Sequence, residues 1–407
     1  MKNRHQRNKE KDLQARLKIA HRKKFFANLK MVCNLYAGYD LFSKLPPFCL
    51  ERIYAVRLRG WILLPTEGTV APPEVLKEMT EWLKILMDLF IIELPNERGK
   101  IPLKVQLEEG FSLALQIDKV KDEGNAAVQE AKEVLSYYKE NEYFGMVLGK
   151  VHELMNTMAV LFTNLDSGFA QFTHTFKHIH DVKNVFYVRD IEPTRKHFVV
   201  DGHARPAVRI GWAYSNLLDW ADIKPSQLGL SSTNDDPMPV FIQSHALKRL
   251  TERMGLTIGM MHFAAFHSIK QCRYHRDERG RILIAYNYFN KKTGYLVCSV
   301  EHGCVLVHTF LFLTNNGTPE GKKLFDLTGL QIMDKKYLAI DRLETLLSYS
   351  IEENELVKTI FIQADCGHLF SLKKEFIGEH HTNSATIIAD YLTKNLNFKS
   401  PPLASIP

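Results

Sequence analysis

The spacing of apolar residues predicts different structure before and after Asp181. Up to that residue, apolar side chains recur at intervals of three and four, which is the period of an amphipathic helix. Two such series are Val75, Met79, Trp82, Leu83, Leu86 and Met146, Val151, Leu154, Met158, Leu161. Proline-rich breaks separate the helical stretches. We therefore expect residues 31–181 to form a helical domain of roughly five or six helices.

The pattern then changes to short runs rich in β-branched and aromatic residues, at 185–188, 197–200 and 207–214. These runs predict a small antiparallel β segment over residues 182–223. The next stretch, 224–239, is rich in Pro, Ser, Asn and Asp, which is the composition of a linker. Since 407 residues exceed one ordinary hydrophobic core, we expect a domain boundary in this linker.

The C-terminal part, residues 240–400, predicts a second α+β domain. Its expected order is a helix capped by Ser244, a second helix, three antiparallel strands and further helices. The expected ranges are 245–254, 257–270, 281–289, 294–300, 304–313, 319–327 and 335–350. The fold class is therefore α+β: a mostly helical N-terminal region, a small antiparallel sheet in the middle, and a C-terminal helix–helix–meander domain with extra helices.

Positive charge is concentrated in residues 1–30, which hold eleven Lys or Arg against two acidic residues. The net charge of this basic arm is +9, whereas that of the whole chain is +7. The rest of the chain is therefore slightly acidic. Such an arm is attracted to phosphate backbones and releases their counterions, which predicts sequence-independent nucleic-acid binding. The alternative is a solvated tail that keeps the protein soluble. The candidate nucleic-acid-binding residues are Arg4, Arg7, Lys18, Arg22, Lys23 and Lys24.

One helix combines chemically useful side chains on a single face. His245, Arg249 and Arg253 lie at i, i+4 and i+8, so helical geometry aligns them. The apolar stripe of the same helix lies elsewhere and is formed by Ala246, Leu247, Leu250 and Met254. The basic stripe should therefore face solvent, a cleft or the following sheet.

The stretch His245-Ala246-Leu247-Lys248-Arg249-Leu250-Thr251-Glu252-Arg253 resembles the H-A-x-x-R-x-x-E-R opening helix of RelE-superfamily toxin-like domains, including those of the BrnT type. The resemblance covers about residues 240–320. It implies RNA cleavage without metal or cofactor, in which a 2′-hydroxyl attacks the adjacent phosphate. His245 would then supply acid–base chemistry, while Arg249 and Arg253 hold phosphate oxygens. It also implies RNA rather than DNA as the partner.

The sequence departs from this family in three respects. The chain continues to residue 407, beyond the end of a compact toxin, and nothing comparable covers residues 1–239. The further catalytic residues of the family do not match position by position. Secondary candidates on the predicted sheet are Arg281, His308 and Thr314.

Two interpretations of the function follow. In the first, the C-terminal domain is a ribonuclease that the basic arm brings to nucleic acid. In the second, Lys248 and Glu252 form an exposed pair, and Arg249 and Arg253 either extend over apolar surface or pair with acids elsewhere. The protein would then be a non-enzymatic accessory or regulatory protein that binds nucleic acid or a protein partner. Only the first requires His245 and the arginines to converge on an open cleft.

Two other groups of residues suit a ligand but have ordinary structural explanations. His174, His178, His180 and Asp181 have metal-ligand spacing on a helix, yet histidines also favour the ends of helices, so we expect no metal. On a predicted strand, cations alternate with rings in a way that suits single-stranded nucleic acid, although any half-buried strand shows such a face. These residues are Arg205, Arg209, Trp212 and Tyr214.

The remaining signals exclude several classes of protein. The six cysteines form no C-x-x-C pair, which favours buried thiols in a reducing compartment over a zinc ribbon or a disulfide framework. No glycine-rich nucleotide fingerprint occurs. The N-terminus lacks an apolar signal region, and residues 82–94 are too short to span a bilayer. We therefore expect a cytoplasmic protein without a membrane partner.

Overall fold

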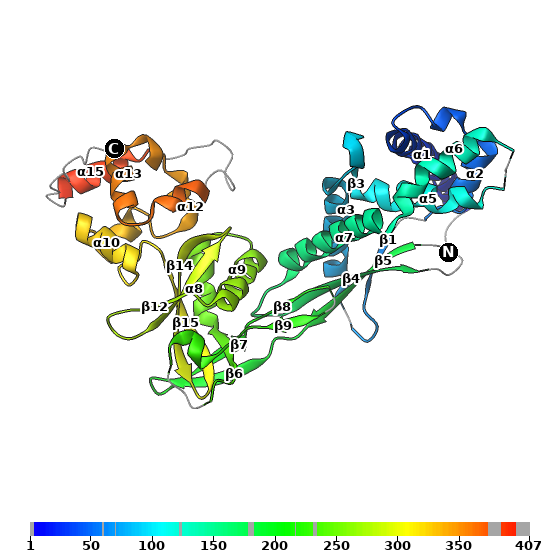
Figure 1. Cartoon of the computed structure of the whole chain (residues 1–407). Coiled ribbons are helices and arrows are strands. Elements are labelled where there is room, and N and C mark those ends of the chain that lie inside the picture. Colours follow the sequence, from blue (N-terminus) through cyan, green and yellow to red (C-terminus); the bar gives the residue numbers. More distant parts are fainter. Residues whose placement is uncertain are drawn as a thin grey trace. The chain divides into compact units, whose positions relative to one another are not determined.

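The computed structural model describes residues 4–58, 61–69, 71–121, 124–177, 183–215, 217–230, 234–372 and 384–395. The chain separates into two compact units, drawn with their elements labelled in Figure 1. Unit 1 comprises residues 1–159, 170–190 and 214–216, and unit 2 comprises residues 160–169, 191–213 and 217–407.

Unit 1 consists mainly of helices, with two small sheets. Its helices are α1 (Arg4–Ala37), α2 (Pro47–Ala55), α3 (Pro73–Leu89), α4 (Leu103–Val105), α5 (Phe111–Gln116), α6 (Ala126–Ser136) and most of α7 (Asn141–Phe162). Its strands are β1 (Trp61–Pro65), β2 (Ile91–Glu93), β3 (Lys100–Pro102), most of β4 (Phe169–Lys177) and most of β5 (Lys183–Ile191). The expected α+β class is confirmed.

The basic arm is the first part of a long helix. In α1 the side chains of residues 11–24 are exposed, whereas Phe25, Leu29 and Tyr36 are buried in unit 1. The exposed part therefore ends near residue 24, and not at residue 30 as expected, because the apolar positions of the helix begin at Phe25. The side chains of Arg4 and Arg7 lie outside the described residues.

Residues 31–181 are not entirely helical. Strand β1 pairs in parallel with β5, which adjoins β4 in a three-stranded sheet. An apolar run as short as Trp61–Pro65 has no distinguishing period, so the sequence does not separate it from a helix. His174 lies on strand β4, and the helical spacing expected for a metal site is therefore wrong at this position. His178, His180 and Asp181 lie outside the described residues.

Unit 2 is built on a mixed sheet with the strand order β12-β13-β14-β15-β11-β7-β6. Strands β11 and β15 are parallel, and the neighbouring pairs are antiparallel. A parallel pair needs a crossover connection, which here contains two helices and three strands. Strands β8 and β9 form a separate two-stranded sheet. The strands of unit 2 are β6 (Arg195–Val200), β7 (His203–Arg209), β8 (Gly211–Ala213), β9 (Leu218–Trp220), β10 (Asp222–Ile223), β11 (Met238–Gln243), β12 (Tyr274–Arg276), β13 (Ile282–Tyr288), β14 (Lys291–Glu301) and β15 (Cys304–Phe312).

Helices α8 and α9 lie in the crossover, and the later helices follow β15. The bounds are α8 (Ser244–Met254), α9 (Ile258–Gln271), α10 (Pro319–Thr328), α11 (Ile332–Tyr337), α12 (Leu343–Ser348), α13 (Glu355–Gln363) and α15 (Thr386–Asn395). These positions agree closely with the expected order of elements. Several details differ. Strands β11 and β12 and helices α13 and α15 were not expected. The expected helix 335–350 is divided into α11 and α12, and Gln243 is the N-cap of α8. Ser244 instead donates to Asp166 Oδ1 at 3.2 Å.

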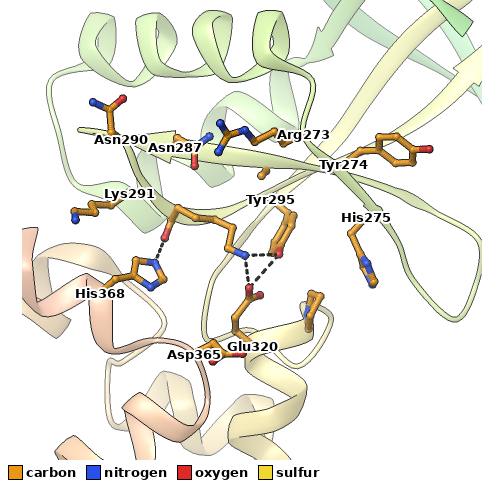
Figure 2. A pocket seen from close by; sticks show the side chains of 13 residues that line it. Arg273, Tyr274, His275, Asn287, Asn290, Lys291, Tyr295, Glu320, Asp365 and His368 are labelled. Atoms are coloured by element: carbon orange, nitrogen blue, oxygen red, sulfur yellow. Dashed lines mark hydrogen bonds and ion pairs between the residues drawn. The ribbon is translucent and has the colours of Figure 1, made fainter. Parts of the chain in front are cut away.

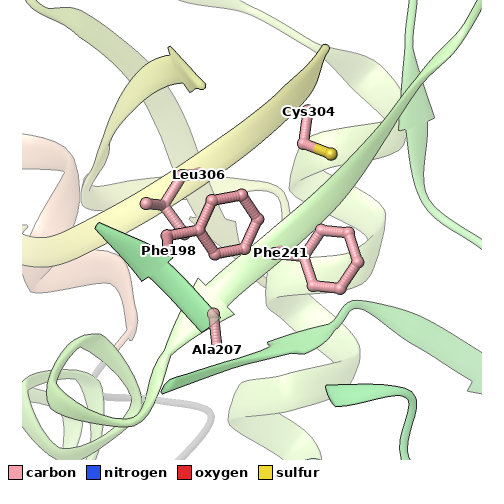
Figure 3. Packing of buried hydrophobic residues seen from close by; sticks show 5 residues of the cluster. All are labelled: Phe198, Ala207, Phe241, Cys304 and Leu306. Carbon is pink, nitrogen blue, oxygen red and sulfur yellow. The ribbon is translucent and has the colours of Figure 1, made fainter. Parts of the chain in front are cut away.

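The division into units does not fall at the expected linker 224–239. Figure 3 shows that Phe198 and Ala207 share a buried cluster with Phe241, Cys304 and Leu306. Strands β6 and β7 thus belong to the same core as the C-terminal strands. Strand β10 pairs with the beginning of β11, so residues 222–223, just before the expected linker, and residues 238–239, at its end, lie in one sheet of unit 2. Polar loop composition was mistaken for a boundary because loops within a domain have the same composition.

A buried carboxyl group distinguishes the centre of unit 1. Glu109 lies in a π-helical turn, Gln106–Gly110, and is 3% exposed. Asn28 donates to its Oε1 at 3.2 Å, and its Oε2 has no hydrogen-bond partner. Burial raises the pKa of Glu109 to about 8, and the negative charge of Glu108 adds to this effect. The carboxyl group is therefore mostly neutral at pH 7.

Replacing Glu109 with Gln should remove a pH dependence of stability. The folded-state pKa lies above the ordinary value of 4.5, so the stabilisation is complete below pH 4.5 and is lost as the pH rises through 8. We expect the free energy of unfolding of the wild type, measured by denaturant titration, to fall relative to Glu109→Gln across this window, by at most about 1.4 kcal/mol per pH unit. The exposed control Glu133→Gln should follow the wild type. Parallel curves for the wild type and Glu109→Gln would contradict the prediction.

Candidate functional site

Unit 2 contains a cavity with a volume of about 730 Å³ (Figure 2). Its walls come from strands β12 to β14, from the beginning of α10 and from residues 365–368. Residues 288–291 make a tight turn between β13 and β14, in which Phe289 and Asn290 have φ of 45° and 58°. Positive φ at both central residues is the geometry of a two-residue hairpin turn, so the turn brings Lys291 directly after β13.

A buried hydrogen-bonded cluster forms one wall of the cavity. Lys292 makes an ion pair with Glu320, and its Nζ donates to the Tyr295 hydroxyl at 3.0 Å. That hydroxyl donates to Glu320 Oε1 at 3.1 Å, and Figure 2 shows Glu320 and Tyr295 pointing toward one another. Burial opposes the charge of Lys292, but the bonds to Glu320 and Tyr295 outweigh it and raise its pKa. Lys292 is therefore an ammonium group at neutral pH and no amine nucleophile.

The charges that line the cavity are unequally compensated. The acids Glu320 and Asp365 are held by Lys292 and Lys323 respectively. Arg273 is exposed and Lys291 is partly exposed, and neither makes an ion pair within the described residues. Two histidines, His275 and His368, also line the cavity. The arrangement therefore presents surplus positive charge to a ligand.

A second layer of contacts fixes Glu320 at the second position of α10. The N-cap residue Thr318 accepts from the Gly321 N–H at 2.9 Å and donates to the Leu313 carbonyl at 2.6 Å. A Cβ atom at Gly321 would lie 1.8 Å from the Asn315 carbonyl oxygen, so only glycine fits there. Buried Lys335 donates to the carbonyls of Thr314 and Gly321, at 2.8 and 2.9 Å.

No pattern in the sequence predicts this cavity. Its lining residues extend from position 273 to position 368 and include no motif with fixed spacing. Lys291 and Lys292 lie between the expected strands 281–289 and 294–300, and no functional role was predicted for them. Only the pairing of the strands and the return of the chain after α13 bring these side chains together.

The three catalytic candidates of helix α8 differ in their exposure and in their partners. His245 is exposed. Arg249 pairs with Glu252 at 2.8 Å, one turn along the helix. Arg253 makes an ion pair with Asp341, and the two side chains are only 14% and 8% exposed. Both guanidinium groups are thus already held by carboxylates of the protein.

The secondary candidates on the sheet also have structural partners. Arg281 Nε donates to Asp277 at 2.7 Å. Thr314 is buried and donates to the Ile340 carbonyl at 2.8 Å. His308 lies 2.6 Å from Ser299 Oγ and 3.3 Å from Gln243 Nε2. The serine hydroxyl donates to Glu301, so the histidine acts as a donor to Ser299 and does not take its proton.

The alternating cations and rings at positions 205–214 do not form one surface. Trp212 is fully buried and packs against Phe263 with ring centroids 4.9 Å apart. Arg209 pairs with Asp222 at 3.0 Å, while Arg205 is exposed and Tyr214 belongs to unit 1. These residues therefore do not provide a stacking platform.

Of the four residues with metal-ligand spacing, the structure describes His174, and burial determines its protonation state. Burial lowers the pKa of His174 to about 4, against a smaller opposite effect of its hydrogen bond with Asn184. Among the residues that the structure describes, no group of three or more His, Cys, Asp or Glu side chains could hold a metal ion. All six cysteines are buried thiols.

Comparisons with protein-family models, with curated proteins and with solved structures find no match to this chain. The resemblance of residues 240–320 to RelE-superfamily domains thus stays a prediction. Within the described residues, no helix is both long enough and apolar enough to cross a bilayer.

Replacing Arg253 with Ala should destabilise unit 2, because the mutation leaves the carboxylate of Asp341 buried without its partner. We expect a loss of about 3 kcal/mol in the free energy of unfolding, measured by denaturant titration. The exposed control on the same helix, Lys248→Ala, should change it by less than about 0.5 kcal/mol. Equal stability of the two variants would show that the pair is not structural.

Replacing Lys335 with Met should loosen the loop before α10 and the first turn of that helix, which carries Glu320. The change removes the donor for two buried carbonyls and for Asn316 Oδ1, to which Lys335 also donates. Since an unsatisfied buried acceptor costs about 1–3 kcal/mol, we expect a total loss of about 2–4 kcal/mol in a denaturant titration. The neighbouring exposed control Lys336→Met should be nearly neutral. A loss no larger than that of the control would rule out the proposed role of Lys335.

Proposed function

We propose that this protein is a non-enzymatic nucleic-acid-binding protein that contacts RNA through the exposed first part of helix α1. The observation that carries the proposal is the run of exposed residues 11–24, which precedes the buried part of the helix. This surface has many cations and little acidic compensation. Its exposed basic residues are Lys11, Arg16, Lys18, Arg22, Lys23 and Lys24.

Some of these cations are paired with carboxylates of the protein, and the others remain available to bind phosphate. Arg16 pairs with Asp12 at 3.0 Å. Arg22 pairs with Glu51 and lies over the rings of Phe26 and Tyr54. Arg22 therefore belongs to the packing of unit 1 more than to a ligand surface. The available candidates from the sequence are Lys18, Lys23 and Lys24.

The geometry of the helix suits contact with a phosphate chain. Lys11 and Lys18 are seven residues apart, as are Arg16, Lys23 and Lys30, so each series lies near one line along the helix. Seven residues correspond to a rise of about 10 Å. The two lines lie roughly 140° apart around the helix, so a strand follows one of them at a time. The flexible lysine side chains of that line can adjust to a backbone whose conformation varies, which supports binding without sequence preference.

Two considerations support binding without cleavage and favour RNA. Arg249 and Arg253 are held by carboxylates, as expected in the non-enzymatic interpretation. RNA is preferred to DNA because the resemblance of helix α8 is to domains that act on RNA.

Neutralising three available lysines should weaken binding and flatten its dependence on salt. In Lys18→Gln/Lys23→Gln/Lys24→Gln we expect about tenfold weaker binding to single-stranded RNA of mixed sequence. The slope of log K against log salt should fall by about 2, at roughly 0.7 per lost phosphate contact. Fluorescence anisotropy at several salt concentrations measures both quantities, with DNA of the same sequence as a second ligand.

The matched control removes the same charge from exposed positions elsewhere on helices, in Lys77→Gln/Lys84→Gln/Lys248→Gln. It should bind RNA like the wild type. If both triple variants lose affinity equally, only net charge matters and α1 is not the binding surface. If neither loses affinity, the exposed helix is a solubility device.

A further inference from the structure

We propose that the cavity between strands β12–β14 and helix α10 binds the phosphate group of a nucleotide. This site is separate from the surface of α1 and does not depend on the function proposed for it. Its volume of about 730 Å³ lies within the range typical of small-molecule sites, roughly 300–1,000 Å³.

The sign of the uncompensated charge points to an anion. Several basic side chains of unit 2 that do not line the cavity are paired: Lys270 with Asp219, Arg281 with Asp277, and Lys322 with Glu278. Arg273 and Lys291 line the cavity without an ion pair among the described residues. Because the two acids that line it are already engaged by lysines, an anion entering the cavity meets surplus positive charge.

The kinds of side chain favour a phosphate among the possible anions. A guanidinium group bonds two oxygens of one phosphate through parallel N–H donors, and an ammonium group adds a third contact as a point charge. The side chains of Asn287 and Asn290 also line the cavity and carry amide donors. Such amides can bond the remaining oxygens or the polar edge of an attached sugar or base.

The wall of the cavity is organised before a ligand arrives. Lys292, Tyr295 and Glu320 fix one another, and His368 Nε2 donates to the Lys292 carbonyl at 2.7 Å. A wall that needs no rearrangement spares the ordering cost of binding. Lys292 is therefore a positioning residue, whereas Arg273 and Lys291 at the rim make the phosphate contacts.

Isothermal titration of the full chain with adenosine 5′-monophosphate, inorganic phosphate and adenosine tests the proposal. The nucleotide should bind, inorganic phosphate should compete with it, and adenosine should bind at least tenfold more weakly. Arg273→Gln and Lys291→Gln should each weaken nucleotide binding about tenfold or more while leaving the unfolding midpoint unchanged. The exposed controls Arg279→Gln and Lys336→Gln should bind like the wild type.

A variant that removes a negative charge distinguishes an anion site from a cavity that is merely polar. Asp365→Asn removes a negative charge from the rim, and Asn tolerates the φ of 58° at this position. It should raise the affinity for the nucleotide about two- to threefold. Weaker binding in Asp365→Asn, equal binding of adenosine and the nucleotide, unchanged binding in Arg273→Gln and Lys291→Gln, or no binding of any phosphate probe would overturn the proposal.

A competition experiment identifies the source of the phosphate. A short RNA with a 5′-phosphate that displaces the mononucleotide, while its 5′-hydroxyl counterpart does not, would assign the site to strand ends. Displacement by mononucleotides alone would assign it to free nucleotides. The triple lysine variant of α1 should retain mononucleotide binding, so failure of the function proposed for α1 remains distinguishable from failure of this site.

Discussion

The position of strand β11 in the centre of the sheet is the constraint on which unit 2 depends. This strand pairs antiparallel with β7 on one side and parallel with β15 on the other. The parallel pairing requires a crossover, which carries helices α8 and α9 and the strands β12 to β14. The two pairings of β11 bring segments from before and after residues 224–239 into one core. The far edge of the sheet is thereby left to form the cavity.

Pairing with carboxylates separates structural cations from available ones throughout the described chain. Arg253 is fixed to Asp341, and Arg22 to Glu51 and two rings. By contrast, Lys18 and Lys23 on α1 are exposed, as is Arg273 at the cavity. A cation already bonded to a buried carboxylate has little to offer a ligand, since the ligand must first break that pair. Both proposals therefore rest on uncompensated side chains.

Burial sets the protonation state of several polar groups in the two cores. Burial raises the pKa of Glu109 to about 8, so its carboxyl group is mostly neutral at pH 7. It lowers the pKa of Lys335 to about 8, so its ammonium group still predominates at pH 7. It also lowers the pKa of His262 to about 4, and this ring accepts the Leu165 N–H at 3.0 Å. These groups position loops and turns. Perturbed protonation alone thus does not identify a ligand site in this protein.

The sequence by itself determined the elements whose pattern is local. The period of apolar residues located α8 and α9, runs of strand-forming residues bounded by turns located β13 to β15, and the charge count located the basic part of α1. The short strand β1 was missed because five apolar residues carry no distinguishing period.

Only the tertiary structure decided which distant segments share a core and which cations lack a carboxylate partner and can bind a ligand. The contacts between Arg253 and Asp341, or between Lys292 and Glu320, join positions separated by up to 88 residues. No local pattern encodes such a partner, because a helix face specifies which side chains point together but not what lies opposite them. For this reason the sequence proposed a site on α8, whereas the three-dimensional arrangement favours the cavity beside α10.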